Sequence, residues 1–165
     1  MKKLTACILM FLFSFAFSGC SKKAPEKINM HINSSYSASM GDMELSGILI
    51  YSEDGEMYLE ISTPDELSGL NFSFTDNFTM GYRGLSVVTE TDYLPTSAFA
   101  QSVKNSLDNA LVSKPMLEET EDKKYTAIAK SDSGLYKIHT DEQGSIKEIE
   151  VVGADVKMKL IKENT

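Results

Sequence analysis

Hydrophobic and polar side chains alternate along much of this 165-residue chain. Apolar residues occupy most second positions over residues 28–40, and the same period of two returns over residues 43–51 and 57–61. A period of two is typical of β-strands that bury one face and expose the other. Gly41-Asp42 and Asp54-Gly55 separate these segments and favour tight turns. We therefore expect antiparallel hairpins.

Shorter strands continue this pattern further along the chain. After a loop over residues 63–69, alternation resumes and predicts strands over residues 70–75, 78–82, 85–89, 124–130, 135–140, 145–152 and 155–162. The acidic stretch 118–122 carries no such alternation and predicts a solvated loop. Strands close in sequence usually pair, so the chain is expected to meander through one antiparallel sheet.

Residues 95–112 have the period of a helix instead. Phe99, Val103 and Leu107 recur at helical spacing with polar residues opposite, and Thr96-Ser97 offers a capping hydroxyl before them. A single apolar stripe predicts that the helix lies on the sheet. The predicted fold class is α+β: a strongly curved antiparallel sheet, a half-open barrel of about 9–11 strands, with one main helix on its concave face.

The N-terminus has the order of an export signal. Lys2 and Lys3 precede an apolar run over residues 4–17, which is too short to span a bilayer, and Ser18-Gly19 leads into Cys20. A cysteine after a small residue resembles a bacterial lipobox, so cleavage is predicted between Gly19 and Cys20, with lipid on Cys20. The alternative is an ordinary signal peptide followed by a chance cysteine.

This order predicts three segments: a signal peptide over residues 1–19, the lipidated cysteine with its tether over residues 20–27, and one domain over residues 28–162. The protein is then exported and lipid-anchored to the outer face of the cell membrane, or to an outer membrane. Lysines in the tether either contact anionic head groups or belong to a plain linker. The net charge of −8 excludes nucleic acid as a partner.

The sequence carries no recognisable catalytic motif. It has no nucleophile elbow, phosphate loop or dinucleotide fingerprint, and His31 and His139 have no second histidine or cysteine at ligand spacing. The acidic turns 52–56 and 141–144 lack the ligand spacing of a calcium loop. We predict no metal, no cofactor and no enzymatic activity.

Methionine and aromatic residues are frequent on the predicted strands. Methionine adapts its shape to whatever it contacts, so these side chains suit an apolar pocket on the concave face as well as an ordinary filled core. The candidate pocket residues, taken from strands and helix, are Met30, Ile32, Leu59, Phe72, Phe74, Met80, Tyr82, Phe99, Val103 and Leu107.

Several motifs resemble those of the LolA/LolB/LppX superfamily of lipoprotein carriers and lipid-binding lipoproteins. They are the lipobox, the stretch 61–70, the Leu94-Pro95 helix start, and the pattern Tyr136-Lys137-Ile138 followed by 144–149. The part of that stretch from Thr63-Pro64 to Gly69-Leu70 and the Leu94-Pro95 helix are also similar to small Firmicutes lipoproteins of that fold, including clostridial spore-germination lipoproteins. The resemblance implies a half-open barrel with an apolar interior. Here one helix is predicted, whereas the carriers have extra helices that plug the cavity.

Two functions fit these features. The first is a membrane-anchored, non-enzymatic module that binds a lipid, an acyl chain or an apolar partner segment. The alternative is an interaction or regulatory lipoprotein of the envelope or spore, with a filled core, that docks a protein partner through a sheet edge or its acidic face.

The lipobox generates a first prediction. Cys20→Ala is expected to leave the precursor uncleaved and without acyl mass, because the modified residue is lost. Intact-mass measurement on protein purified from membranes checks this, with Cys7→Ala in the apolar run as the control that keeps both events. A free Cys20 thiol in the wild-type protein would contradict the lipobox.

Overall fold

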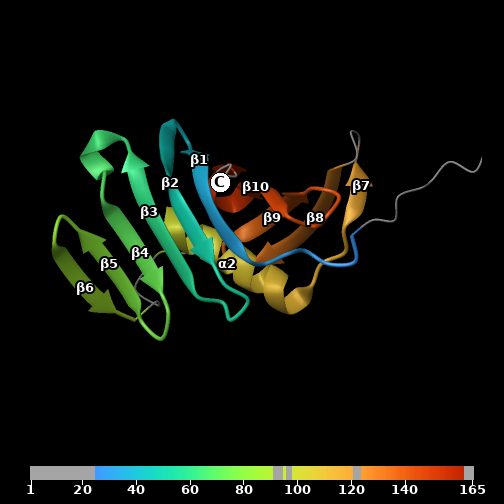
Figure 1. The fold of residues 1–165 in the computed structure, drawn as a ribbon, viewed down its shortest axis with the longest axis horizontal. Coiled ribbons are helices and arrows are strands. Elements are labelled where there is room, and N and C mark those ends of the chain that lie inside the picture. The colour runs from blue at the N-terminus through green and yellow to red at the C-terminus, as the bar shows by residue number, and fades with distance from the viewer. Residues whose placement is uncertain (1–24, 91–94, 96–97, 121–123, 162–165) are drawn as a thin grey trace, which may run out of the picture.

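The computed structural model describes residues 25–90, 95, 98–120 and 124–161. Gly19, Cys20 and the other predicted signal and lipidation positions lie outside the described residues. Within them, eleven antiparallel strands form one open sheet with a helix laid across it (Figure 1). This confirms the α+β class predicted from the alternation. None of the described helices is both long and apolar enough to cross a bilayer.

The strands follow the predicted segments closely. They are β1 Ile32–Met40, β2 Met43–Tyr51, β3 Met57–Thr63, β4 Leu70–Phe74, β5 Phe78–Tyr82, β6 Leu85–Thr89, β7 Glu118–Thr120, β8 Lys124–Ser131, β9 Gly134–Thr140, β10 Ile146–Val151 and β11 Val156–Ile161. The long helix is α2 (Phe99–Ser113), and two short 3-10 turns are η1 (Asp65–Leu67) and η4 (Val152–Ala154).

The order of the strands places the two chain halves on opposite arms of the sheet. It runs β6-β5-β4-β3-β2-β1-β11-β10-β9-β8-β7, so β1 and β11 pair in the middle while β6 and β7 form the two edges. Helix α2 is the connection between those edges, and it passes behind β1 and β2 in Figure 1. The first half of the chain therefore builds one arm, and the second half builds the other.

Helix α2 buries the predicted apolar stripe against the sheet. Val103 and Leu107 have no exposed surface, and Phe99 is buried beside them. Ser102 and Ser106 are also fully buried, and their hydroxyls donate to the carbonyls of Phe99 and Ser102 in their own helix. Because these hydroxyls are paired locally, two small polar residues can lie in the core and let the helix approach the sheet.

Polar residues of the same helix bind both arms of the sheet. The Tyr51 hydroxyl of β2 donates to Asp108 at 2.8 Å, and the Tyr136 hydroxyl of β9 donates to Asn109 at 2.9 Å. Burial, with the bond to Asp108, raises the pKa of Tyr51 well above its ordinary value of 10.0. Lys104 forms an ion pair with the same Asp108. The helix is thus fixed from two sides.

A glycine allows the arm β1–β3 to pack tightly. Tyr36 is almost fully buried, and its hydroxyl donates to the carbonyl of Glu60 at 3.2 Å. The intervening Gly47 lies at a register shift between β2 and β3, where a Cβ would sit 1.7 Å from that carbonyl oxygen. No other residue type fits this position without a backbone shift.

Three predictions differ from the structure by more than one residue. The first strand begins at Ile32, not at residue 28, because Asn29 makes a single bridge to Ser145 before the pairing with β2 starts. The helix begins at Phe99, and its N-cap Ala98 offers no side chain for capping. Residues 118–120 form edge strand β7 instead of a loop, since backbone pairing with β8 needs no apolar alternation.

The packing of α2 generates a second prediction. Leu107→Asp places an unpaired charge at a fully buried position and is expected to lower the free energy of unfolding by about 3–5 kcal/mol. Val112→Asp is the matched control on the same helix, because Val112 is 82% exposed. Chemical denaturation of both variants checks the difference, and equal stabilities would show that α2 does not pack on the sheet.

Candidate functional site

The segment that follows the predicted tether is fixed against the turn between β9 and β10. The Asn29 amide donates to the carbonyl of Gly144 at 2.8 Å. Gly144 has a φ of +78°, and a Cβ there would lie 2.4 Å from the carbonyl oxygen of Lys27. Asp141 stabilises the turn by accepting from the amides of Gln143 and Ser145. This docking holds the residues around Ile28 in a defined place.

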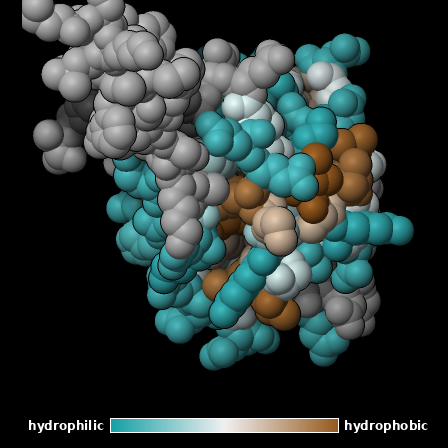
Figure 2. Space-filling view, turned by 90° about the vertical axis from the view of Figure 1, so that its right-hand side faces the viewer, coloured by the Kyte–Doolittle hydropathy of each residue, from teal (hydrophilic) through white to brown (hydrophobic). Residues whose placement is uncertain are grey.

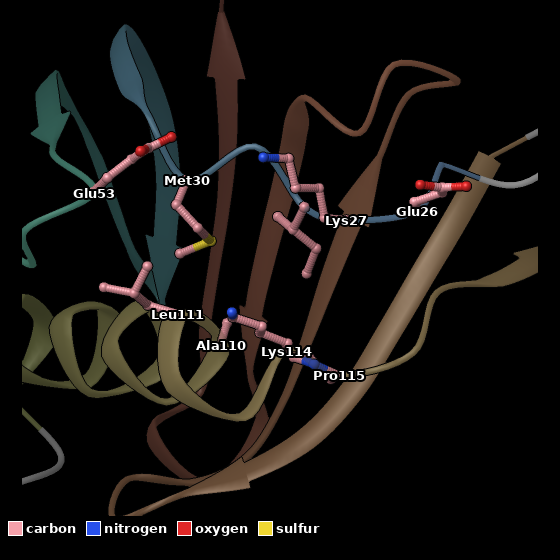
Figure 3. A pocket seen from close by; sticks show the side chains of 9 residues that line it. Glu26, Lys27, Met30, Glu53, Ala110, Leu111, Lys114 and Pro115 are labelled. Atoms are coloured by element: carbon pink, nitrogen blue, oxygen red, sulfur yellow. The ribbon is translucent and has the colours of Figure 1, made fainter.

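A cavity of about 300 Å³ lies between that segment and the end of α2 (Figure 3). Figure 3 shows Met30 and Leu111 pointing toward each other, Glu53 and Glu26 at opposite ends of the view, and Lys27 and Lys114 between them. The residues that line it come from the N-terminal segment, the β2–β3 turn and the helix end, and are Glu26, Lys27, Ile28, Met30, Glu53, Ala110, Leu111, Lys114 and Pro115.

The lining of this cavity suits an apolar guest with a polar end. Ile28, Met30, Ala110 and Leu111 supply aliphatic surface, and four charged residues complete the lining. Ligand pockets are mostly apolar with a few polar groups that orient the ligand, and they begin at about 300 Å³. We call this cavity the helix-end pocket.

A second apolar area lies on the concave face beyond the reach of α2. Directly paired residues share a face, and the register joins Leu59 to Phe72, Phe72 to Met80, and Met80 to Val87. Exposure rises along this row from 0% at Leu59 to 38% at Met80 and 55% at Val87. The row passes from filled core to open surface as it leaves the helix.

The ten predicted pocket residues separate into three groups. Met30 lines the helix-end pocket. Phe72, Met80 and Tyr82 lie on the open part of the concave face, where they are partly or well exposed. The other six residues are buried in the common core: Ile32, Leu59, Phe74, Phe99, Val103 and Leu107. The structure therefore does not bring the ten residues together into one cavity.

The sequence reasoning missed most of the helix-end pocket. Ala110 and Leu111 lie in the predicted helix over residues 95–112, and Ile28 lies in the alternating segment 28–40. No local pattern places residue 28 beside residue 111, because their proximity depends on the docking of the N-terminal segment onto Gly144.

The face that points away from α2 carries a charged cluster. On β9 and β10, Ile138 and Ile149 are buried, so the alternating residues His139, Glu148 and Glu150 face outward. They border a groove of about 850 Å³. Their ligand atoms lie within 4.8 Å of one another, a spacing that a metal ion can bridge.

Lysines already neutralise the two carboxylates of this cluster. Lys157 contacts Glu148 and Glu150, each at 3.0 Å, and Lys137 contacts Glu150 at 2.9 Å. His139 pairs through Nδ1 with the Thr126 hydroxyl at 2.8 Å. We interpret the cluster as an ion-pair network, and the absence of a metal stays a prediction.

The network shifts the titration of its central carboxylate. Hydrogen bonds from Lys137 and then Lys157 lower the pKa of Glu150 from its ordinary 4.5 to about 2. A lowered folded-state pKa stabilises the fold at pH values above the unfolded-state pKa, and this contribution disappears as the pH falls through the folded-state value. The relevant window is therefore pH 4.5 down to about 2.

The pH dependence of this ion pair gives the third prediction. Glu150→Gln is expected to cost about 1 kcal/mol of unfolding free energy at pH 7, the scale of a solvent-accessible ion pair. The difference from the wild type should vanish as the pH falls from 4.5 to about 2. The single variant Lys137→Gln keeps Glu150 but removes its first lysine partner. In this variant, the stabilisation by Glu150 should therefore be lost at a higher pH than in the wild type. A pH-independent effect of Glu150→Gln in urea titrations would contradict the assignment.

Comparisons with known proteins complete this description. No family model matches the sequence, and no curated protein is significantly similar to it. Eleven chains in solved structures match the fold. Among them is a LolA superfamily protein from Nitrosomonas europaea, with 9% sequence identity and a TM-score of 0.37, in a match that covers 85% of this chain and 89% of that chain.

Proposed function

We propose that this protein is a membrane-anchored, non-enzymatic binding lipoprotein whose helix-end pocket accepts an acyl chain or another slender apolar segment. The observation that carries the proposal is the aliphatic cavity of about 300 Å³ between Met30 and Leu111. Each CH₂ that leaves water for such a lining contributes about 0.8 kcal/mol. A short stretch of acyl chain is therefore enough for measurable binding.

The charged opening fits a ligand with a polar head. Lys27 and Lys114 line the pocket together with Glu26 and Glu53, so groups of both signs can contact a head group. Charged side chains at the opening of an apolar pocket keep the head group in water while the chain enters. A lipid or fatty acid has both parts, whereas a purely apolar molecule uses only the lining.

The anchor is the second part of the proposal. Lipid on Cys20 would hold the exported domain on the outer face of the cell membrane, or on an outer membrane where one exists. The kinship with small Firmicutes lipoproteins, suggested by the stretch 61–70, belongs to this proposal as well. Acyl chains on the anchor give stable attachment without a spanning helix.

An edge strand favours a second candidate function. Strand β6 ends one arm of the sheet, and Leu85, Val87 and Val88 are 76%, 55% and 64% exposed. A short apolar edge strand can receive a partner strand through its backbone groups. In this alternative the protein is an interaction or regulatory lipoprotein, and its partner is an envelope or spore protein that docks on β6.

The fourth prediction separates the two functions. The full chain is expected to take up a fluorescent fatty acid saturably, because apolar burial drives its entry. Leu111→Trp narrows the helix-end pocket and should weaken uptake about tenfold, the equivalent of roughly two methylenes. Met80→Trp, on the open concave face, is the control and should leave uptake unchanged.

Other uptake results would place the binding site elsewhere or favour the second function. Weaker uptake in Met80→Trp with normal uptake in Leu111→Trp would move the site to β4–β6. A lack of saturable uptake in the wild-type chain would reject the acyl-binding function and favour docking on β6. Circular dichroism of both variants controls for folding.

A further inference from the structure

Two large apolar side chains stand in solvent beside the opening of the helix-end pocket. Val112 and Met116 are each 82% exposed, although their chain neighbours Leu111 and Pro115 line the pocket. Figure 2 shows the side of the molecule on which α2 ends in Figure 1, and apolar side chains gather there within a hydrophilic frame. Scattered exposed apolar residues are common, but each of these two directly follows a residue that lines the same pocket.

The chain itself limits how far this opening can lie from the predicted anchor. Glu26 lines the pocket and is six residues after Cys20. A fully extended chain spans at most about 3.3–3.6 Å per residue, so the two positions are no more than about 20 Å apart. A lipid on Cys20 therefore keeps the opening of the pocket close to the bilayer surface.

The charges at this end favour an uncharged lipid surface over an anionic one. Lys27 and Lys114 are matched by Glu26 and Glu53 among the residues that line the pocket. Glu118 and Glu119 of β7 are exposed, two and three residues after Met116, and add negative charge. The exposed apolar side chains, and not an attraction between charges, therefore favour contact with a bilayer.

We infer that the end of α2 lies on the bilayer, with Val112 and Met116 inserted among the head groups and the helix-end pocket open toward the membrane. The inference rests on the proposed anchor at Cys20, because two side chains alone bind a membrane too weakly to hold the protein there. It adds an orientation and a route: an acyl chain enters the pocket directly from the outer leaflet, without crossing water.

The chain contains no tryptophan, so a single introduced tryptophan reports its own position. Met116→Trp and Val112→Trp place the reporter at the inferred contact, and Leu85→Trp places it on β6 at the opposite arm, where residue 85 is 76% exposed. The full chain, purified from membranes, is reconstituted into phosphatidylcholine vesicles that contain bromine-labelled lipid. Bromine quenches only a tryptophan that lies in or at the bilayer.

We expect several-fold stronger quenching for Met116→Trp and Val112→Trp than for Leu85→Trp. The tryptophan emission of the first two variants should also be blue-shifted relative to that of Leu85→Trp. Quenching at residues 112 and 116 should not increase when anionic phosphatidylglycerol replaces part of the phosphatidylcholine, because the exposed Glu118 and Glu119 repel anionic head groups. Equal quenching at all three positions, or stronger quenching at residue 85, in protein that floats with the vesicles would overturn the orientation and leave the anchor intact. Protein without acyl mass that stays off the vesicles would overturn the anchor, and the orientation with it.

Discussion

The connection between the two edge strands is the constraint on which the structure depends. Strands β6 and β7 are consecutive in the chain and yet lie at opposite edges of an eleven-stranded sheet. The chain must cross the whole sheet between them, and it does so as α2 on the concave face. A helix of 15 residues is roughly 22 Å long, much less than the width of a flat sheet of this size. A helix of this length can contact both arms only because the sheet curves around it.

The same helix divides the concave face into filled and open parts. Under α2, Val103 and Leu107 close the core completely, and the hydroxyls of Tyr51 and Tyr136 bind its polar side from both arms. Where the helix ends, the helix-end pocket remains, and beyond its reach the row that contains Met80 emerges into solvent. Both candidate binding surfaces exist because one helix cannot cover so wide a sheet. The pocket is the better candidate for a slender ligand since three separate elements enclose it.

The two faces of the sheet differ in chemistry. The concave face and the helix end carry the apolar groups that favour lipid, whereas the opposite face carries the network of Glu148, Glu150 and Lys157 over a wide polar groove. The turn 141–144, on which the N-terminal segment docks, also contributes Asp141, Glu142 and Gln143 to that groove. The ion pairs connect β9, β10 and β11 across this face.

Sequence periodicity determined the local elements because each depends on neighbouring residues. Alternation located ten of the eleven strands, and the spacing of Phe99, Val103 and Leu107 located α2. The polar strand β7 was not predicted because residues 118–120 are all exposed and show no apolar alternation. The tertiary structure alone decided the rest: the pairing of β1 with β11, the meeting of residue 28 with residue 111, and the burial of most predicted pocket residues. These features join residues that are far apart in the chain. They depend on the crossing of α2 over the sheet and on the docking of the N-terminal segment, and no local sequence pattern encodes either.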